Sequence, residues 1–523
     1  MSKVKTSVLF KQYNQQQNFL LPPSLDELIG PTHLVRVVNR VVDAMDISGL
    51  INQYEGGGTT AFHPRMLLKV LLYAYSVKIY TGRKIARALC QDIHFMWLAA
   101  MNRPDFRTIN GFRSGKAKEV IEVLFKEMLL FLMEHQYIKM ENYFCDGSTF
   151  AADANRHKMV WKKSADRYKD AAEQRCKDLF KQIDQLNCVE EKQYGDQDLE
   201  ETGSIVVSPQ AIEQQVNKLN KIIENTTAQK QKRKAKSLKK HLEQQGSKIN
   251  KYETQIETAG KRSGYSKTDR DATGMRMKNQ ETLPAYNALA GSENQFIVNC
   301  SIHQNTNDGV CFKKHVEQLE QHSEVKPKVI MADCIFGTEE NYELLQNSKI
   351  DNYLKFPSFH NEQKKSYQNN PFLKDNFRYD VLTDTYSCPN DQLLILQRTA
   401  VETHKRTGYQ SQLKIYACEN CSGCPFYDKC CKSEKEKNRT IKVNEKLEAY
   451  KQQARENLKS EKGLELRKQR GVEIESCFGD IKHNMGFRRF HVRGLQKVKA
   501  EWSFVAMAHN LRKIHLQTSK KAA

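Results

Sequence analysis

The sequence lacks a long apolar run and an apolar N-terminus. No stretch reaches the roughly 18 apolar residues that a membrane-spanning helix needs. The longest candidate, EVIEVLFKEMLLFLMEH, is interrupted by charges at helical spacing and predicts an amphipathic helix. The first residues, MSKVKTSVLF, contain no apolar segment of the kind found in signal peptides. These absences argue against a membrane or secreted protein, and we expect an intracellular, cytoplasmic one.

Acidic residues are too few to balance the basic ones. The chain has 83 Lys and Arg against 62 Asp and Glu, which gives a formal net charge of +21. A surplus of this size favours a polyanionic partner such as nucleic acid. The alternative is a lysine-rich surface that is simply solvated. Hydrophobic residues make up 39% of the chain, which indicates a globular protein rather than a disordered one.

Composition and periodicity change several times along the 523 residues, a length that suits several domains. We divide the chain into a helical N-terminal domain, the first part of an α/β core, a helical insertion, the second part of the core, a Cys-rich insertion and a C-terminal helical part. These segments are residues 1–135, 136–162, 163–262, 263–356, 357–440 and 441–523.

The N-terminal segment reads as a series of amphipathic helices. HLVRVVNRVVDAM places Leu34, Val38, Val41, Val42 and Met45 on one stripe. Further along, PDFRTINGFRS suggests a helix-turn-helix, whose second helix reads base edges. Its exposed candidates for DNA contact are Arg107, Thr108, Asn110 and Arg113. An ordinary helical bundle with surface arginines is the alternative.

The segment 163–262 repeats apolar residues at alternating spacings of three and four, as in Ala172, Cys176 and Leu179. This rhythm is the seam of a coiled coil. The polar break around EKQYGDQDLEETGSIVVSPQ predicts the loop of an antiparallel pair. We interpret the segment as a helical hairpin that serves as a spacer, with contact to DNA or to a partner as the alternative.

The segment 357–440 reads as irregular and contains a dense group of cysteines. Fourteen cysteines in a chain without a signal peptide argue for reduced thiols rather than a disulfide framework. The candidate metal ligands are Cys388, Cys418, Cys421, Cys424 and Cys430. Two-residue gaps let thiolates reach one tetrahedral ion at about 2.3 Å. We predict a structural zinc held by four of these five, with Cys431 as another possible ligand. An iron–sulfur cluster and free thiols are the alternatives.

Two aspartates stand where apolar, β-rich runs end. Asp146 follows NYFC and precedes a Gly-Ser-Thr turn, and Asp333 follows VIMA. An Asp at such a place is often only a turn former or a helix cap. A third acid comes from the helical GVEIESCFGDIKHNMGFRRF, in which Glu475 and Lys482 are seven residues apart and share a face. The basic residues that follow include Arg488, Arg489 and Arg493.

Three separated carboxylates beside a basic strip fit two-metal phosphoryl chemistry. Two Mg²⁺ (or Mn²⁺) ions about 3.5–4 Å apart need acidic oxygen ligands. Asp146 would bridge both ions, while Asp333 and Glu475 would each bind one. Lys482 and the arginines would neutralise phosphate oxygens.

At these residues the chain resembles bacterial insertion-sequence transposases of the DDE superfamily. The segments that carry the likeness are FHPRMLLKVLLYAY and PDFRTINGFR near the N-terminus, YFCDGSTFAADANRHKMVWKK around Asp146, VIMADCIFGTEENYELL around Asp333 and VEIESCFGDIKHNMGFRRFHVRGLQKVKAEWSFVAMAHNLRKI around Glu475. The last segment is the most specific. The resemblance covers almost the whole chain.

The resemblance implies an RNase H-like catalytic core, a mixed sheet flanked by helices. It also implies a Mg²⁺-dependent enzyme that binds the terminal inverted repeats of its own element, cleaves the DNA there and joins the 3′-hydroxyls to target DNA. The partner is then double-stranded DNA, at the nucleoid, and family members generally act as dimers that pair two ends. Two alternatives are a catalytically silent DNA-binding descendant and a nuclease without strand transfer.

The chain departs from its relatives on the Glu helix. Many of them carry Tyr, Arg, Glu and Lys there, with Arg four residues before Glu. Here Gly471 stands at the Arg position and Lys468 at the Tyr position. Phosphate contact by Arg467 or Arg470 is therefore a hypothesis. No catalytic acid is missing.

Overall fold

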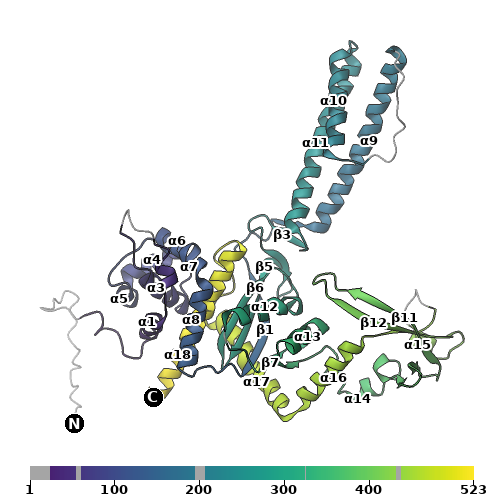
Figure 1. The fold of residues 1–523 in the computed structure, drawn as a ribbon. Helices are drawn as coiled ribbons and strands as arrows, with labels where there is room; N and C mark the ends of the chain where they lie inside the picture. Colours follow the sequence, from purple (N-terminus) through teal and green to yellow (C-terminus); the bar gives the residue numbers. More distant parts are fainter. Residues whose placement is uncertain (1–23, 55–59, 195–205, 324, 432–436, 523) are drawn as a thin grey trace, which may run out of the picture.

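The computed structural model describes residues 24–54, 60–194, 206–323, 325–431 and 437–522. The N-terminal part is helical, as expected (Figure 1). Its helices are α1 (Leu34–Ala44), α2 (Ser48–Ile51), α3 (Pro64–Ser76), α4 (Gly82–Gln91), α5 (Ile93–Leu98), α6 (Phe106–Ser114), α7 (Lys116–Glu119) and α8 (Ile121–Glu134). The whole stripe that begins at Leu34 and ends at Met45 is buried, which confirms the periodicity argument.

A six-stranded mixed sheet forms the centre of the molecule. Its strands are β1 (Asn142–Ala151), β4 (Thr273–Arg276), β5 (Thr282–Glu293), β6 (Phe296–His303), β7 (Val329–Ala332) and β8 (Asp351–Leu354). The order is β4-β5-β1-β7-β8, with β6 also paired to β5. Strands β1, β7 and β8 are parallel to one another, while β5 is antiparallel to its neighbours β1, β4 and β6.

Strands β5 and β6 form a β-hairpin. Its turn residues Asn294 and Gln295 have φ values of 53° and 63°. Positive φ at both central residues is the requirement of a tight turn whose twist matches that of the strands. Glu293, the last residue of β5, is buried and accepts backbone N–H groups of residues 139–142. The hairpin thereby fixes the entry of the chain into β1.

Helices cover both faces of the sheet. Helix α12 (Asp308–His322) contacts β5 and β6, and α17 (Glu461–Gly479) contacts β1, β5 and β7. Side chains of β1 alternate between these layers. The hydroxyl of Tyr143 hydrogen-bonds with His315 of α12, whereas Phe150 packs against Phe478 of α17. Asp146 shares the parity of Phe150 and therefore faces α17.

The helical insertion projects away from the sheet (Figure 1). It contains α9 (Lys162–Tyr194), α10 (Pro209–Asn225) and α11 (Gln229–Ala259), and α11 packs against both others. The second arm of the expected hairpin is thus broken into two helices. Ser208 caps α10, whose first residue is proline, and the extended Thr226 ends it. Strands β2 (Met159–Trp161) and β3 (Gly264–Ser266) pair at the base of the insertion.

The Cys-rich segment is not irregular, and this expectation was wrong. It forms a five-stranded antiparallel sheet in the order β13-β12-β11-β10-β9. The strands are β9 (Arg378–Asp380), β10 (Thr385–Ser387), β11 (Leu393–Thr403), β12 (Gln410–Cys418) and β13 (Thr440–Val443). Strand β11 is largely exposed, so its sequence shows no alternation of apolar and polar residues.

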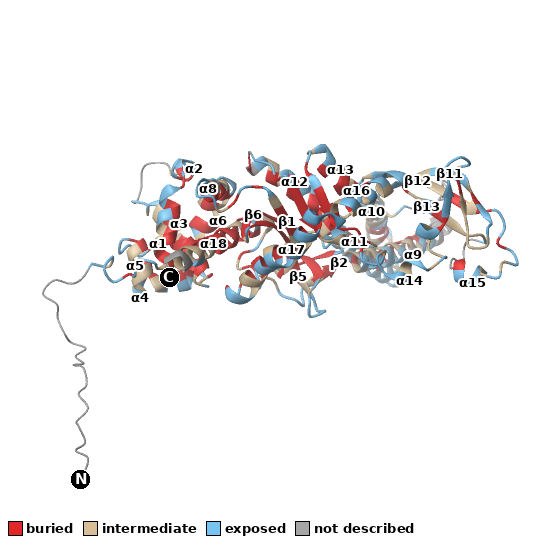
Figure 2. Cartoon of the chain, turned by 90° about the horizontal axis from the view of Figure 1, so that it is seen from below, coloured by how far each residue is buried: buried red, intermediate tan, exposed pale blue. Residues whose placement is uncertain are grey.

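The C-terminal part returns to the core as helices. Beside α17 these are α16 (Glu445–Lys459), a π-helical turn (Asp480–Asn484) and α18 (Leu495–Ala522). Helix α18 contacts both β6 and the N-terminal helices α1, α3 and α8, and Figure 2 shows much of it buried. Along α18 the apolar residues Val498, Trp502, Val505, Leu511 and Ile514 are fully buried, while Leu495 at its start is only partly buried.

Candidate active site

Asp146 and Asp333 lie on neighbouring strands. Asp333 directly follows β7, as the sequence predicts, but β1 continues to Ala151, so Asp146 stands mid-strand. The correction has a simple physical basis. Cys145 and Ala332 form the last pair of the parallel ladder between β1 and β7. Beyond it β1 stays paired with β5 but no longer with β7, so both aspartates occupy the point where the parallel ladder ends.

Burial and neighbouring charges set the protonation of Asp146. Its pKa is raised to about 6, first by burial. The Arg470 guanidinium and the backbone N–H of Gly147 oppose this rise, whereas the carboxylates of Asp308 and Asp333 add to it. Asp146 is therefore a crowded acid, and an added cation would relieve the crowding.

Arg470 brings the three expected acids together. Its Nη2 atom is 3.5 Å from Oδ1 of Asp146 and 3.9 Å from Oδ2 of Asp333, and its Nη1 atom is 3.1 Å from Oε1 of Glu475. The arginine is buried, whereas the side chain of Glu475 is 55% exposed. The Nε atom of Arg470 has no hydrogen-bond partner within the described structure. One guanidinium is thus the shared counter-charge of three carboxylates, and one of its own N–H groups makes no hydrogen bond in the described structure.

The acids suit a hard divalent cation in their chemistry. Carboxylate oxygens are the ligands that Mg²⁺ prefers. In the part of the chain that the structure describes, no group of three His, Cys, Asp or Glu side chains has the geometry of a metal site. The guanidinium of Arg470 contacts the carboxylates of Asp146, Asp333 and Glu475 in this structure. The donor set therefore fits, provided that Arg470 withdraws and the exposed Glu475 turns inward.

Lys482 lies beside the same strand. Its ammonium donates hydrogen bonds to the Ser148 hydroxyl and, at 3.1 Å, to the carbonyl of Thr149. Burial and then Lys278 lower its pKa to about 8, while Asp146 opposes that shift. The seven-residue spacing from Glu475 spans the end of α17 and the π-helical turn. That both residues serve one site stays a prediction.

Asp308 is an acid that sequence reasoning missed. It is the first residue of α12 and lies against Gly147, because a Cβ atom at Gly147 would be 2.6 Å from the Asp308 carboxyl carbon. Burial raises its pKa, and a hydrogen bond from Asn287 opposes that rise. The sequence TNDG around it looks like an ordinary helix cap, and Asn307 is indeed that cap. Only the packing on Gly147 shows that Asp308 adjoins Asp146.

Two family models match the chain. One is a transposase DDE domain over residues 387–515, and the other is a transposase domain, DUF772, over residues 23–115. The chain belongs to the insertion-sequence transposases of the DDE superfamily. The first match contains the Glu475 helix and most of the Cys-rich sheet, and the second contains helices α1 to α6. No curated protein and no solved structure matches this transposase.

The basic residues expected at DNA differ in their surroundings. In the transposase, Arg489 and Arg493 are half-exposed and both pair with Asp153, at 2.6 Å and 2.9 Å. Arg488 is exposed and donates to the carbonyl of Lys482. The bridge between Ala151 and Arg489 places this strip at the end of β1.

The N-terminal candidates are only partly available. Arg107 is exposed, and Thr108 and Asn110 are half-buried. Arg113 is buried, so the expectation that it is exposed for base reading was wrong. Its guanidinium donates to the Tyr75 hydroxyl and the Tyr80 carbonyl and lies 3.8 Å from Glu501 of α18. Arg113 therefore joins the N-terminal helices to α18.

The cysteines of the five-stranded sheet gather around one small cavity. Its lining includes Cys388, Cys418, Cys421, Cys424, Cys430 and Cys431. Two of the sulfurs already accept backbone N–H groups, Cys388 from Asn390 at 3.4 Å and Cys421 from Arg439 at 3.3 Å. Within the described residues the thiols do not yet adopt a metal-binding arrangement.

No helix in the described ranges has the length and apolar character needed to cross a bilayer.

Proposed function

We propose that this transposase cleaves DNA at the ends of its own insertion sequence and joins the 3′-hydroxyls to target DNA. The observation that carries the proposal is the convergence of Asp146, Asp333 and Glu475 on the Arg470 guanidinium. Acids separated by nearly 330 positions in sequence thus lie around one point, and metal-dependent phosphoryl transfer needs carboxylates that converge in this way. The family matches support a DNA substrate.

An RNase H-like core is part of this proposal. The central sheet has the order β6-β5-β1-β7-β8, with the first three strands antiparallel and the last two parallel to β1. This arrangement supports the assignment, because it places the first acid on the central strand and the second on its parallel neighbour. The third acid then comes from a helix packed on the same face.

Each residue has a distinct role in the proposed reaction. The chemistry supplied by two bound Mg²⁺ or Mn²⁺ ions is activation of the attacking water or hydroxyl and stabilisation of the leaving oxygen. Asp146, Asp333 and Glu475 would hold them. Arg470 keeps the acids together before loading and then turns to the phosphate oxygens. Lys482 holds the backbone of β1 and orients the strand that carries Asp146.

We also propose that the cysteine cavity holds one structural zinc. The support is that all five expected ligands and Cys431 line the same small cavity at one end of the sheet. Four thiolates around one ion are a usual structural zinc site. A homodimer that pairs two element ends is the proposed working assembly.

The proposal is tested with a duplex that carries the element's terminal repeat and a supercoiled target. Asp333→Asn should retain binding and lose Mg²⁺-dependent cleavage at least a hundredfold. The matched control is Asp351→Asn, an exposed aspartate at the opposite end of the neighbouring strand β8, which should cleave normally. Wild-type binding without cleavage would support the silent descendant, and cut ends without joined products would support the nuclease.

A further inference from the structure

A large cavity lies outside the acid cluster, between three segments far apart in sequence. It has a volume of about 780 Å³. Its walls come from the end of α11 at residues 258–263, the loop and helix at residues 303–314 and the β11–β12 turn with Arg406 and Thr407. We infer that this cavity binds phosphate groups of the DNA backbone next to the cleavage site. The inference rests on the proposed function, which supplies the DNA.

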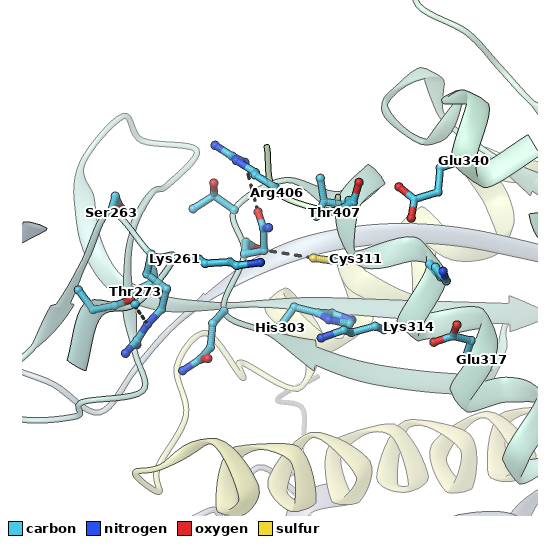
Figure 3. A pocket seen from close by; sticks show the side chains of 18 of the residues that line it. Lys261, Ser263, Thr273, His303, Cys311, Lys314, Glu317, Glu340, Arg406 and Thr407 are labelled. Carbon is cyan, nitrogen blue, oxygen red and sulfur yellow. Dashed lines mark hydrogen bonds between the residues drawn. The ribbon is translucent and has the colours of Figure 1, made fainter. Parts of the chain in front are cut away.

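The cavity carries an excess of positive charge. Its cationic lining residues are Lys261, Arg262, Lys313, Lys314 and Arg406, against the carboxylates of Glu317 and Glu340. In Figure 3 Lys261 and Arg406 lie toward one end, and the two glutamates lie toward the other. A concave surface with excess positive charge concentrates polyanions.

Several cations of the cavity are available to a ligand. Among the residues that the structure describes, neither Lys261 nor Lys314 has an ion-pair partner, and both are exposed. Arg406 is exposed and, in the described ranges, its side chain hydrogen-bonds only the side-chain oxygen of Asn305, at 3.3 Å. An arginine fork can bind a phosphate through two parallel hydrogen bonds. Lys261, Lys314 and Arg406 are thus the proposed phosphate ligands.

Other lining residues act as walls rather than as ligands. The guanidinium of Arg262 donates to the carbonyls of Thr258, Ala259 and Arg270. It therefore holds the end of α11 against the core. Burial, followed by Lys314 and Lys499, lowers the pKa of His303 to about 4. The imidazole is neutral near pH 7, so the positive charge of the cavity comes from Lys and Arg.

The cavity also lies close to the acid cluster. The loop that lines the cavity at Asn305 and Thr306 continues directly to Asp308, which packs on Gly147 next to Asp146. The cavity is therefore one loop away from the proposed catalytic acids, on the side of the sheet that α12 covers. Asp146 itself faces α17, so a DNA strand bound at both places would cross from one face of the sheet to the other. Residues here would hold DNA without taking part in the chemistry.

The test is the triple variant Lys261→Gln, Lys314→Gln, Arg406→Gln of the full chain. Affinity for the terminal-repeat duplex is measured by fluorescence anisotropy over a series of salt concentrations. Each lost phosphate contact should reduce the slope of log K against log salt by about 0.9, so a reduction of roughly 2 to 3 is expected. The cleavage rate at sub-saturating DNA should fall in proportion to the affinity.

The matched control is Lys326→Gln, Lys328→Gln, Lys349→Gln, which removes the same charge. These exposed lysines flank the starts of β7 and β8, at the far ends of these strands from Asp333. Their loss should leave most of the salt slope in place. The single variant Arg406→Gln should give about one third of the triple effect and guards against misfolding of the triple variant.

Several results would overturn the inference. If the triple variant has the same salt slope as the control, the cavity does not contact DNA, although wild-type cleavage would still support the proposed function. If wild type binds no duplex, both fail together. If the triple variant loses binding of a free nucleoside triphosphate, measured by calorimetry, while duplex affinity is unchanged, the cavity is a nucleotide site.

Discussion

Arg470 decides the resting state of the acid cluster. Its position is one residue before the one at which many relatives have arginine, and Gly471 occupies that place. A glycine leaves the space beside Glu475 open, since a Cβ at Gly471 would be 4.0 Å from Oε2 of that residue. Of the two arginines considered from sequence, Arg470 reaches the acids, while Arg467 stacks on Phe359 with its guanidinium carbon 5.1 Å from the ring centre.

We predict that Arg470→Ala makes the protein dependent on divalent cations for stability. Without them, three carboxylates would lose their shared counter-charge, and the free energy of unfolding should fall by about 2 kcal/mol. Millimolar Mg²⁺ should raise the melting temperature of this variant more than that of the wild type. Arg467→Ala is the control on the same helix. Equal Mg²⁺ shifts in all three proteins would show that the guanidinium and the ions do not compete.

At the scale of elements, apolar periodicity predicts those helices and strands that bury only one face. The stripe on α1 follows from apolar spacing, because one side of this helix packs on a core. The hairpin of β5 and β6 is buried on both faces, and the position of its turn predicts it instead. The exposed strand β11 carries no such signal. Strand β1 misleads for another reason: Gly147 and Ser148 look like a turn, but the glycine is there because Asp308 lies where a side chain would be.

The acidic residues of the candidate site could be predicted from the sequence, but the positions of its basic residues could not. Asp146, Asp333 and Glu475 are named by sequence and meet in the structure. The reach of Arg470 depends on side-chain conformation, and the approach of Lys482 depends on a π-helical turn, which no spacing rule signals. Arg113 looked accessible because its helix is short and polar, yet it faces a helix nearly 400 positions later in the sequence.

The five-stranded sheet should depend on metal. We predict about one zinc per chain by elemental analysis, and a loss of melting temperature on treatment with a strong chelator. Cys421→Ser should lower both zinc content and stability, since Cys421 lines the cavity. Cys90→Ser, at an exposed cysteine of α4, should change neither. A brown protein with visible absorption would instead support the iron–sulfur alternative, and a metal-free wild type of equal stability would contradict both.

At the scale of the whole molecule, α18 unites the N-terminal helices with the sheet. Asp480 in the π-helical turn accepts from His509 at 2.9 Å and lies 3.6 Å from Arg512. Arg512 in turn donates to the carbonyl of Ser76 at the end of α3. His509 is buried and Asp480 and Arg512 are partly buried, and these contacts join three separate parts of the sequence. Its protonation therefore bears on global stability.

We predict that stability falls as pH rises above about 6.5. Burial alone would lower the pKa of His509, but Cys477 and Asp480 raise it to about 10. Because the pKa of His509 is raised on folding, the stabilisation by its charged form is complete below about pH 6.5, the pKa of an unfolded histidine. This stabilisation is lost as pH approaches 10. The free energy of unfolding should fall by about 1–3 kcal/mol over this range, as measured by urea titration.

The companion variant is Asp480→Asn, which removes the partner of His509. Burial would raise the pKa of Asp480, yet His509, Asn484 and Arg512 lower it to about 2. The stabilisation that comes from the lowered pKa of Asp480 is complete above the pKa of an unfolded aspartate. It is lost only as pH falls toward 2, so it does not change stability in the alkaline range. The variant should be less stable near pH 6 and should lose less on alkalinisation. An unchanged alkaline slope would exclude His509 as its source.

The base of the helical insertion has a consequence for how such enzymes diversify. Strands β2 and β3 pair, and the amide of Lys162 bonds the carbonyl of Ser263, so the chain leaves and rejoins the core at almost the same point. The β2–β3 pairing and this hydrogen bond close an insertion of about a hundred residues. Lengthening, shortening or exchanging the arm would leave the enzyme body undisturbed, which makes the arm a free variable on which lineages could differ while their chemistry stayed constant.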